Sequence, residues 1–368
     1  MKNSMQKLIS SKIGSLTKIL FSGLFISIAI FACSKHHGYE ETPNPDPPSD
    51  GISIKEGHYL QDPCGNKINL RGVNMGSVYA VDFGSRELSE IAKTGANAVR
   101  IVLEKTYKDW SKGGLITNLS GGTIEELIKI CLNNKMIPVL ELHDYTGSSD
   151  PSSSVGGATD WWCSSAIRKS LEPYNGSIII NIANEPENGS GDPALLKNAY
   201  SAAINKMRNQ KYTCPLMLDS YNWAKDANFV INFGNLLMQQ DPLHNLIFSI
   251  HAYWPTHGAY GDYSDAKITA DMTGLKNTDL PIVVGELAMA DVQDQNYAIN
   301  YTLIMKLCQQ NGFGYLAWWW GFYNNPGANN ILSMTNTGIY TGLTGPGKII
   351  AVTDPYSIQR TSIRPCHL

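Results

Sequence analysis

Eight short apolar segments that alternate with helical segments predict a closed (β/α)₈ barrel of the TIM type. Residues 51–368 are long enough for one such barrel with insertions. A doubly wound open sheet is the alternative, but no glycine-rich nucleotide loop follows any of the apolar segments. The sequence therefore favours a single barrel domain.

The predicted strands are rich in Val, Ile and Leu, as expected of parallel strands that are buried on both faces. They are expected at residues 68–75, 98–103, 137–144, 177–185, 215–220, 246–253, 281–288 and 315–320. Amphipathic segments between them predict the helices, and a glycine such as Gly95 marks a helix end. The clearest helices are expected at residues 87–95, 123–135, 161–171, 193–210 and 296–312, whereas the eighth helix has no clear pattern.

The first 50 residues differ in composition from the predicted barrel. Residues 1–18 carry four lysines, and residues 19–32 are apolar but too short for a comfortable transmembrane helix, a combination typical of an export signal. The sequence Ile-Phe-Ala-Cys that ends at Cys33 resembles a bacterial lipoprotein box. We therefore expect residues 1–33 to be a lipoprotein signal peptide with Cys33 as the lipidated residue. An ordinary signal peptide with an incidental cysteine is the alternative.

Residues 34–50 are polar and rich in proline, so they cannot build a packed core and predict an extended tether. The expected order is thus a signal peptide (1–33), a tether (34–50) and a globular domain (51–368). Such a protein is exported and held by lipid at a bacterial membrane or cell surface, or is otherwise periplasmic or secreted.

Exported proteins often contain disulfides. Cys64 and Cys366 flank the two ends of the domain and are one candidate pair, but six cysteines besides Cys33 allow fifteen complete pairings. Buried free thiols are an equally good interpretation for most of the others, which are Cys131, Cys163, Cys214 and Cys308. The chain contains no C-x-x-C spacing, so we expect no zinc site.

Polar, charged or aromatic residues end nearly every predicted strand, and the active site of a (β/α)₈ barrel lies at these carboxyl ends. Taken alone, each such residue has an ordinary structural explanation, such as an ion pair or a satisfied core histidine. Taken together, they indicate a functional site. The residues are Asn74, Arg100, His143, Asp144, Asn184, Glu185, Asp219, His251, Tyr253, Glu286, Trp318, Trp319 and Trp320.

Glu185 and Glu286 end the fourth and seventh predicted strands, which lie across the barrel mouth from each other. Two carboxylates that flank one bond are the arrangement for glycoside hydrolysis, in which one group is protonated and the other ionised. Arg100 can hold one carboxylate in its charged form, and Tyr253 can donate a hydrogen bond to the nucleophile. Asn184 supplies an amide that can bind a sugar hydroxyl.

The domain resembles glycoside hydrolase family 5, and especially its bacterial endo-1,4-β-mannanases, from about Gly57 to Pro365. The resemblance rests on eight segments in this order: LRGVN (70–74), IAKTGANAVRIVL (91–103), NNKMIPVLELHDYTG (133–147), NIANE (181–185), FSIHAY (248–253), VVGELA (283–288), YLAWWW (315–320) and YSIQRTSI (356–363).

The resemblance implies a retaining hydrolase in which Glu185 is the acid/base and Glu286 the nucleophile. It implies a supporting shell of Arg100, His143, Asn184, His251 and Tyr253, with Trp318 as the aromatic platform under the sugar. We expect Trp254 and Trp320 to offer flat surfaces for neighbouring sugars. We expect no metal and no cofactor, and a monomer that acts on β-mannan or a related polysaccharide.

The chain departs from the mannanases at positions that would line the sugar subsites. Pro186 follows the acid/base where those enzymes usually have Trp, and the segments at 74–79 and 253–263 also differ. An endo-β-1,4-glucanase or glucomannanase therefore remains an alternative.

Other classes of protein are less well supported. A non-catalytic glycan-binding surface lipoprotein is disfavoured by the presence of both Glu185 and Glu286. A metal-dependent barrel hydrolase would need a tighter ligand cluster than His143, Asp144 and His251 suggest. A nucleic-acid partner is not expected, because the formal net charge is −3 and no basic stripe is present.

Overall fold

The computed structural model describes residues 51–368 apart from 110–112, 258–262, 293, 322–330 and 367. The predicted signal peptide, the lipidation candidate Cys33 and the tether lie outside the described residues. Within the described part of the chain, no helix combines the length and apolarity that a membrane span requires.

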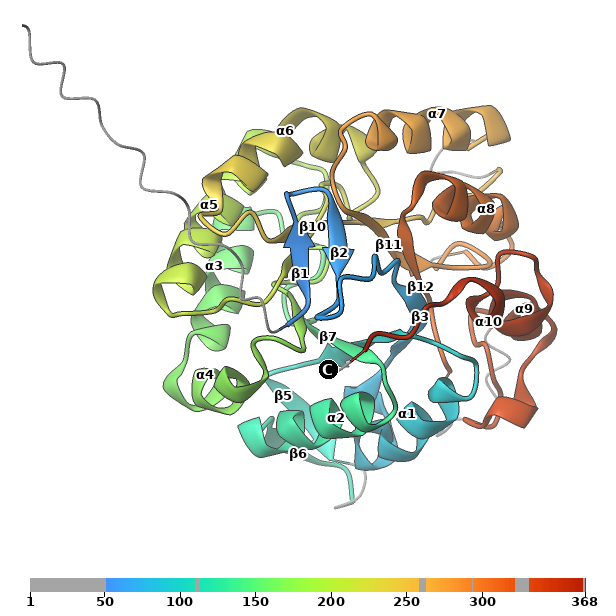
Figure 1. Cartoon of the computed structure of the whole chain (residues 1–368), viewed down its shortest axis with the longest axis horizontal. Helices are drawn as coiled ribbons and strands as arrows, with labels where there is room; N and C mark the ends of the chain where they lie inside the picture. Colours follow the sequence, from blue (N-terminus) through green and yellow to red (C-terminus); the bar gives the residue numbers. More distant parts are fainter. Residues whose placement is uncertain (1–50, 110–112, 258–262, 293, 322–330, 367) are drawn as a thin grey trace, which may run out of the picture. The chain divides into compact units, whose positions relative to one another are not determined.

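Eight parallel strands close into a barrel in the order β10-β11-β12-β3-β4-β7-β8-β9, which confirms the predicted fold (Figure 1). Every residue of these strands is buried, as the apolar runs predicted. The strands are β3 (Arg71–Met75), β4 (Ala98–Leu103), β7 (Ile137–Leu142), β8 (Ile179–Asn181), β9 (Leu216–Asp219), β10 (Leu246–His251), β11 (Ile282–Leu287) and β12 (Gly314–Ala317). Several observed strands are shorter than predicted, so His143, Glu185 and Tyr253 lie in loops just beyond strand ends.

Helices surround the barrel and connect its strands (Figure 1). The α-helices are α1 (Ser85–Ala92), α2 (Gly121–Asn133), α3 (Pro151–Trp162), α4 (Ser165–Leu171), α5 (Pro193–Asn209), α6 (Ala227–Gln240), α7 (Asp265–Lys276), α8 (Tyr301–Asn311), α9 (Gly345–Lys348) and α10 (Ile358–Thr361). The shorter helical segments are η1 (Ser77–Tyr79), η2 (Val81–Gly84), η4 (Glu172–Tyr174), η5 (Tyr340–Gly342) and η6 (Ile349–Thr353).

The prediction of one helix at residues 161–171 was wrong, because two helices, α3 and α4, occupy this region. Helix α3 begins ten residues earlier, where Asp150 accepts hydrogen bonds from two first-turn amides and Pro151 occupies the first turn. It ends at Trp162, and Ser164 then takes an extended conformation before α4 begins. The predicted helix at 296–312 likewise starts only at Tyr301, because the side chain of Asn300 caps it.

Two antiparallel hairpins that the sequence did not predict lie at opposite ends of the barrel. Strands β1 (Ser53–Lys55) and β2 (Tyr59–Gln61) lie over the end at which the barrel strands begin (Figure 1). Strands β5 (Thr106–Asp109) and β6 (Leu115–Asn118) follow β4 and therefore flank the opposite end.

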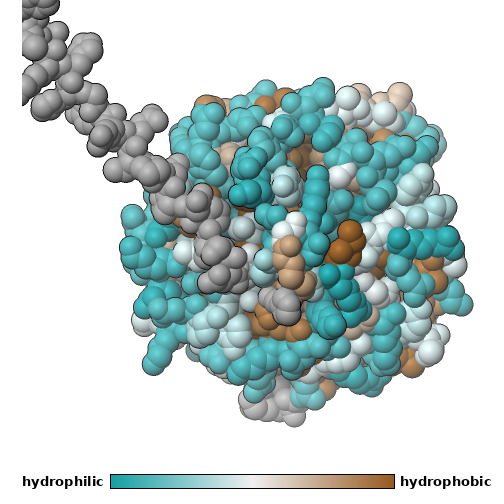
Figure 2. Space-filling view, viewed as in Figure 1, coloured by the Kyte–Doolittle hydropathy of each residue, from teal (hydrophilic) through white to brown (hydrophobic). Residues whose placement is uncertain are grey.

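The two ends of the domain meet beside the first hairpin. Cys64 and Cys366 form a disulfide, which confirms that candidate pair. Asp62 reinforces the junction, because its carboxylate accepts hydrogen bonds from the backbone amides of Cys64, Asn66 and Cys366. The space-filling view from this side shows a mainly hydrophilic face with scattered apolar residues (Figure 2). The free thiols among the described residues are Cys131, Cys163, Cys214 and Cys308.

Candidate active site

Glu185 follows β8 in an unusual backbone conformation. Its φ of 38° lies in the left-handed region, which a residue other than glycine rarely adopts. The backbone amide of Glu185 donates to Oδ2 of Asp219 over 3.0 Å, and its carbonyl accepts the amide of Gly147 over 2.8 Å. Both backbone groups are thus held where the buried strand ends, and the side chain reaches the imidazole of His251.

Glu286 lies inside β11, and its carboxylate is almost completely buried. Its Oε1 accepts a hydrogen bond from Nη1 of Arg100 over 3.0 Å, and its Oε2 accepts one from the hydroxyl of Tyr253 over 2.6 Å. These two donors stabilise the ionised carboxylate, which is the form that a nucleophile needs.

His251 links the two carboxylates. Its Nδ1 lies 2.7 Å from Oε1 of Glu185 and 3.6 Å from Oε1 of Glu286. One ligand atom of each of these three residues lies within 4.8 Å of the others. This closeness matches retaining glycosidases, whose carboxyl groups lie about 5–5.5 Å apart, rather than inverting ones at about 6.5–9.5 Å.

Arg100 on β4 is fully buried and organises the site. Besides Glu286, its guanidinium donates to three amide oxygens at 2.7–2.9 Å. The acceptors are the side chains of Asn74, Asn181 and Asn184. A buried guanidinium with this many partners is rigid, and it fixes the positions of the residues around it.

Burial and charge shift the pKa values of this cluster. Burial alone lowers the pKa of His251, but the carboxylates of Glu286, Asp219 and Glu185 outweigh it and raise that pKa to about 9. Burial raises the pKa of Glu286, and the positive charges of His251 and Arg100 oppose part of this rise. The raised pKa favours the protonated form of His251, whose positive charge in turn favours the ionised form of Glu286.

His143 and Trp318 form one wall of the site. Burial lowers the pKa of His143, but the carboxylate of Glu141, 3.2 Å from its Nδ1, outweighs burial and raises that pKa above its ordinary value. The imidazole ring stacks on the indole of Trp318 with centroids 6.2 Å apart, and Trp318 is only partly buried.

The side-chain amide of Asn184 has fewer hydrogen-bonding groups available for a sugar than the sequence suggested. Its Oδ1 accepts from Arg100, and its Nδ2 donates to Oγ1 of Thr146 over 3.0 Å. One amide hydrogen is left for a substrate.

The prediction that Trp254 and Trp320 present flat surfaces to sugars was wrong. Both side chains are fully buried. The indole of Trp254 stacks on Tyr263 and donates to the carbonyl of Lys225, whereas the indole of Trp320 donates to the carbonyl of Gly338. All three tryptophans lie in apolar stretches, so nothing in the sequence distinguished Trp254 and Trp320 from Trp318.

Three polar residues of the site received no role from the sequence. Glu141, Asn181 and Asp219 are fully buried on β7, β8 and β9. Asp219 was predicted only as a strand-end residue, whereas Glu141 and Asn181 were missed. The signal for these two is a polar residue inside an otherwise apolar strand, because such a group is retained only when partners satisfy it.

By distance, Glu185, His251 and Glu286 could also hold a metal ion. Arg100 and Tyr253 already donate to the two oxygens of Glu286, and the guanidinium of Arg100 places a positive charge beside the cluster. These donors fit an anionic carboxylate pair better than a cation site. The residues in the other group of possible ligands include the two disulfide cysteines.

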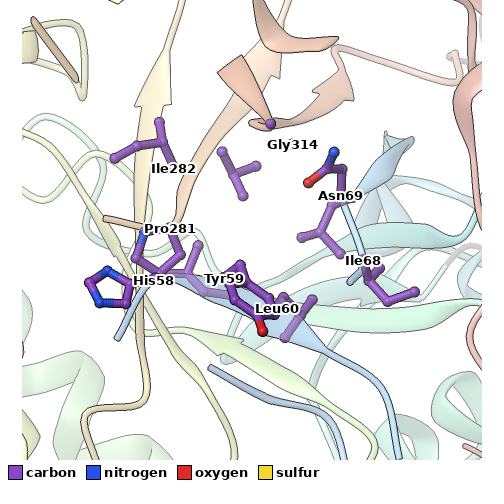
Figure 3. Close-up of a pocket in the computed structure, with 12 residues that line it drawn as sticks. His58, Tyr59, Leu60, Ile68, Asn69, Pro281, Ile282 and Gly314 are labelled. Atoms are coloured by element: carbon purple, nitrogen blue, oxygen red, sulfur yellow. The ribbon is translucent and has the colours of Figure 1, made fainter. Parts of the chain in front are cut away.

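A separate pocket lies at the opposite end of the barrel, between β2 and the first residues of β10, β11 and β12 (Figure 3). Its volume of about 30 Å³ suits a single water molecule rather than a sugar. The lining residues include no carboxylate. The carboxylate pair at the strand ends is therefore the better candidate for catalysis.

Comparisons with known proteins agree with this geometry. The family model "Cellulase (glycosyl hydrolase family 5)" matches residues 62–324. A mannan endo-1,4-beta-mannosidase of Cellvibrio japonicus (strain Ueda107) is 34% identical over 293 residues, which span 77% of this chain and 63% of that relative. A mannan endo-1,4-beta-mannosidase of Salipaludibacillus agaradhaerens is 32% identical over 72% of this chain and 80% of the relative.

Solved structures share the barrel. A crystal structure of beta-mannanase from Streptomyces thermolilacinus with mannohexaose superposes with a TM-score of 0.72 at 27% identity. The match covers 85% of this chain and 97% of that one.

Proposed function

Because the chain belongs to glycosyl hydrolase family 5, we propose that it is a retaining endo-1,4-β-mannanase, with Glu185 as the acid/base and Glu286 as the nucleophile. The observation that carries the proposal is the close pair of buried carboxylates, joined by His251 and set within a barrel that mannanases share. A non-catalytic glycan-binding lipoprotein is not supported, since the family and the relatives are hydrolases.

The reaction proceeds in two displacements. In the first, the Glu286 carboxylate attacks the anomeric carbon while Glu185 gives its proton to the departing glycosidic oxygen, which leaves a glycosyl-enzyme ester. In the second, Glu185 takes a proton from water, and the oxygen of that water attacks the same carbon and releases Glu286. Two inversions retain the β configuration.

The surrounding side chains serve each step. Arg100 and Tyr253 donate to Glu286 and keep it ionised before the attack. His251 contacts Glu185 directly, so it can stabilise the carboxylate that forms once the proton has left. Trp318 offers a partly exposed indole face on which a sugar can stack.

Mutagenesis of the two carboxylates tests the mechanism. Glu286→Ala should abolish formation of the glycosyl-enzyme. Glu185→Ala should be least harmful on aryl mannosides with a good leaving group, because these need little protonation. Glu172→Ala, at an exposed ion pair with Arg168, is the control. NMR of the first-formed product should show the β anomer, and an initial α product or near-normal activity of Glu286→Ala would refute the assignment.

Mannose differs from glucose by an axial 2-hydroxyl, which His143 and Asn184 are the best placed to recognise. We expect turnover of unbranched mannan or glucomannan to exceed that of pure β-glucan at least about tenfold, which corresponds to roughly 1.4 kcal/mol in transition-state binding. A panel of galactomannan, glucomannan, carboxymethylcellulose, xylan and xyloglucan with product sizing measures this. Equal or better turnover of the cellulosic substrate would favour the glucanase alternative and leave the carboxylate mechanism intact.

We further propose that Cys33 carries lipid and that residues 34–50 hold the catalytic domain away from a membrane. The support is the lysine-rich start, the short apolar stretch and the proline-rich segment of the sequence. Changing Cys33 to Ser should move the protein from the membrane fraction to the soluble fraction without loss of activity. A wild-type protein that is fully soluble and starts after Cys33 would disprove lipidation.

A further inference from the structure

Asp219 lies at the end of β9 and is fully buried among the residues of the proposed active site. Its Oδ1 accepts a hydrogen bond from Nδ2 of Asn181 over 3.0 Å. Its Oδ2 accepts the backbone amide of Glu185 and lies 3.3 Å from Nε2 of His251 and 3.7 Å from the guanidinium of Arg100. A buried carboxylate is stable only when it is paired and hydrogen-bonded, and these partners of Asp219 all belong to the site.

The contact with Glu185 acts on its backbone. A residue other than glycine stays in the left-handed region only where its surroundings hold it there. Asp219 holds the amide of Glu185 from one side, and Gly147 holds the carbonyl from the other. Without the carboxylate of Asp219, the amide of Glu185 loses its acceptor, and the backbone can relax toward a more common conformation.

The contact with His251 acts on its protons. The Nδ1 of His251 faces Glu185, whereas its Nε2 faces Asp219 at a distance of 3.3 Å without the alignment of a hydrogen bond. An anion beside Nε2 favours a proton on that nitrogen, so the remaining proton is shared between Nδ1 and Glu185. The other charged groups around this imidazole are Glu286 on β11 and, across the carboxylates, Arg100 on β4.

We propose that Asp219 is a positioning residue for the acid/base: it fixes the backbone of Glu185 and keeps Nε2 of His251 protonated, so that Glu185 can deliver and recover its proton. This role rests on the proposed function, because it presupposes that Glu185 is the acid/base. Asp219 itself touches no substrate in this mechanism.

The test is the isosteric variant Asp219→Asn in the otherwise unchanged protein, assayed on two substrates. On β-mannan, we expect kcat to fall about 10- to 100-fold with little change in KM, as for impaired proton transfer. On 2,4-dinitrophenyl β-mannobioside, whose leaving group needs little protonation, kcat/KM should fall less than about threefold. The alkaline limb of the activity profile on mannan should move to lower pH by about one unit, because His251 loses a neighbouring anion.

The control variant is Asp241→Asn, which removes another fully buried carboxylate, paired with Arg208 away from the site. It reports the cost to stability of losing a buried charge and should leave the ratio of activities on the two substrates unchanged. Asp219→Ser, whose hydroxyl is too short to reach the amide of Glu185, replaces Asp219→Asn if that variant fails to fold. In the wild-type protein, ¹⁵N NMR of the histidines should show His251 protonated at Nε2 at neutral pH.

The outcomes separate this role from the proposed function. Equal losses on both substrates, wild-type kinetics in Asp219→Asn, or an unprotonated Nε2 would overturn the positioning role. If Glu185→Ala keeps its activity on mannan, the acid/base assignment itself fails. If Glu185→Ala shows the expected dependence on the leaving group but Asp219→Asn does not, only the role of Asp219 is refuted.

Discussion

At the scale of single residues, the site depends on how charges are distributed around Glu286. Arg100 and Tyr253 each donate to one of its oxygens, and His251 adds a positive charge 3.6 Å away. Burial alone would favour the protonated acid, which cannot attack carbon. The donors therefore offset part of the desolvation at this carboxylate, and removing one of them should change the pH at which the enzyme becomes active.

Tyr253→Phe tests this balance. The hydrogen bond from the Tyr253 hydroxyl lowers the pKa of Glu286, so its loss should raise that pKa. The acid limb of kcat/KM should then move to higher pH, and the maximal rate should fall about tenfold or more, since hydrogen bonds to charged groups contribute about 1.5–3 kcal/mol. A pH profile on soluble mannan measures both effects.

Tyr212→Phe is the matched control, because the Tyr212 hydroxyl is also buried and donates to a backbone carbonyl, that of Trp162, away from the site. It should cost stability without moving the acid limb. An unchanged limb in Tyr253→Phe, or equal shifts in both variants, would show that this hydroxyl does not control the ionisation of Glu286.

At the scale of elements, the close approach of β10 and β11 sets the position of His251. A Cβ at Gly285 would lie 2.2 Å from Oγ of Ser249 and 3.3 Å from Nε2 of His251. The strand register also shifts between Ile250 and His251, which brings His251 opposite Glu286. Gly285 thus gives room for the imidazole that bridges the two carboxylates.

Gly285→Ala should displace Ser249 and His251 and lower kcat/KM by about tenfold or more, in keeping with the sensitivity of catalysis to misplacement of about 1 Å. It should also lower the melting temperature, because the new methyl group overpacks the barrel interior. The measurements are steady-state kinetics and thermal unfolding.

Gly156→Ala is the control for this change. Gly156 lies within α3, where an added Cβ meets nothing within 4 Å. The substitution should raise stability by about 0.5–1 kcal/mol without a change in kcat/KM. If Gly285→Ala, like Gly156→Ala, keeps kcat/KM unchanged and does not lower the melting temperature, the packing of β10 against β11 does not position His251.

The elements of the barrel and its rim were predictable because burial on both faces leaves a strong apolar signal, as in β4 and β11. The break between α3 and α4 was not predicted, because a polar cap such as Asp150 within a loop-like segment is a weak signal. The hairpins were missed because their three- and four-residue strands are too short for a clear alternation.

For the site, sequence position identified Glu185, Glu286 and Arg100 as residues at strand ends, but it could not show how deeply each side chain is buried. Trp318 and Trp320 are two residues apart, yet one is partly exposed and the other fully buried. Asp219 contacts the backbone amide of Glu185, and Glu141 contacts the imidazole of His143, and contacts of that kind depend on which strands are neighbours. Only the closed barrel defines those neighbours.

At the scale of the whole molecule, the disulfide joins residues 64 and 366 at the end of the barrel opposite to the carboxylate pair. Replacing both cysteines with serine should lower the free energy of unfolding by about 2–4 kcal/mol, because the unfolded chain gains freedom. Activity at 25 °C should stay unchanged, since Asp62 still binds the amides on both sides of the junction. Chemical denaturation and kinetics measure this, with Cys163→Ser as the control at a free thiol. If the double variant loses activity at 25 °C as well as stability, the junction between the two ends of the domain influences the active site.

The charge cluster also makes the stability of the whole domain depend on pH. The pKa of His251 is about 9 in the folded protein and about 6.5 in an unfolded chain, so its charged form stabilises the fold by about 3 kcal/mol. Because the folded pKa is the higher one, this stabilisation is fully present below pH 6.5 and is lost as the pH rises through 9. The raised pKa of His143 acts in the same direction.

We therefore expect the urea midpoint of the wild type to fall as the pH rises from 6.5 to 9. The fall should be smaller in His251→Asn, which should already be less stable than the wild type at pH 6. His58→Asn, at an exposed ion pair, should keep the wild-type slope. A midpoint that does not change over this range would mean that His251 is neutral in the folded protein. The two buried carboxyl groups would then be stabilised by Arg100 and by hydrogen bonds, without a charge on His251.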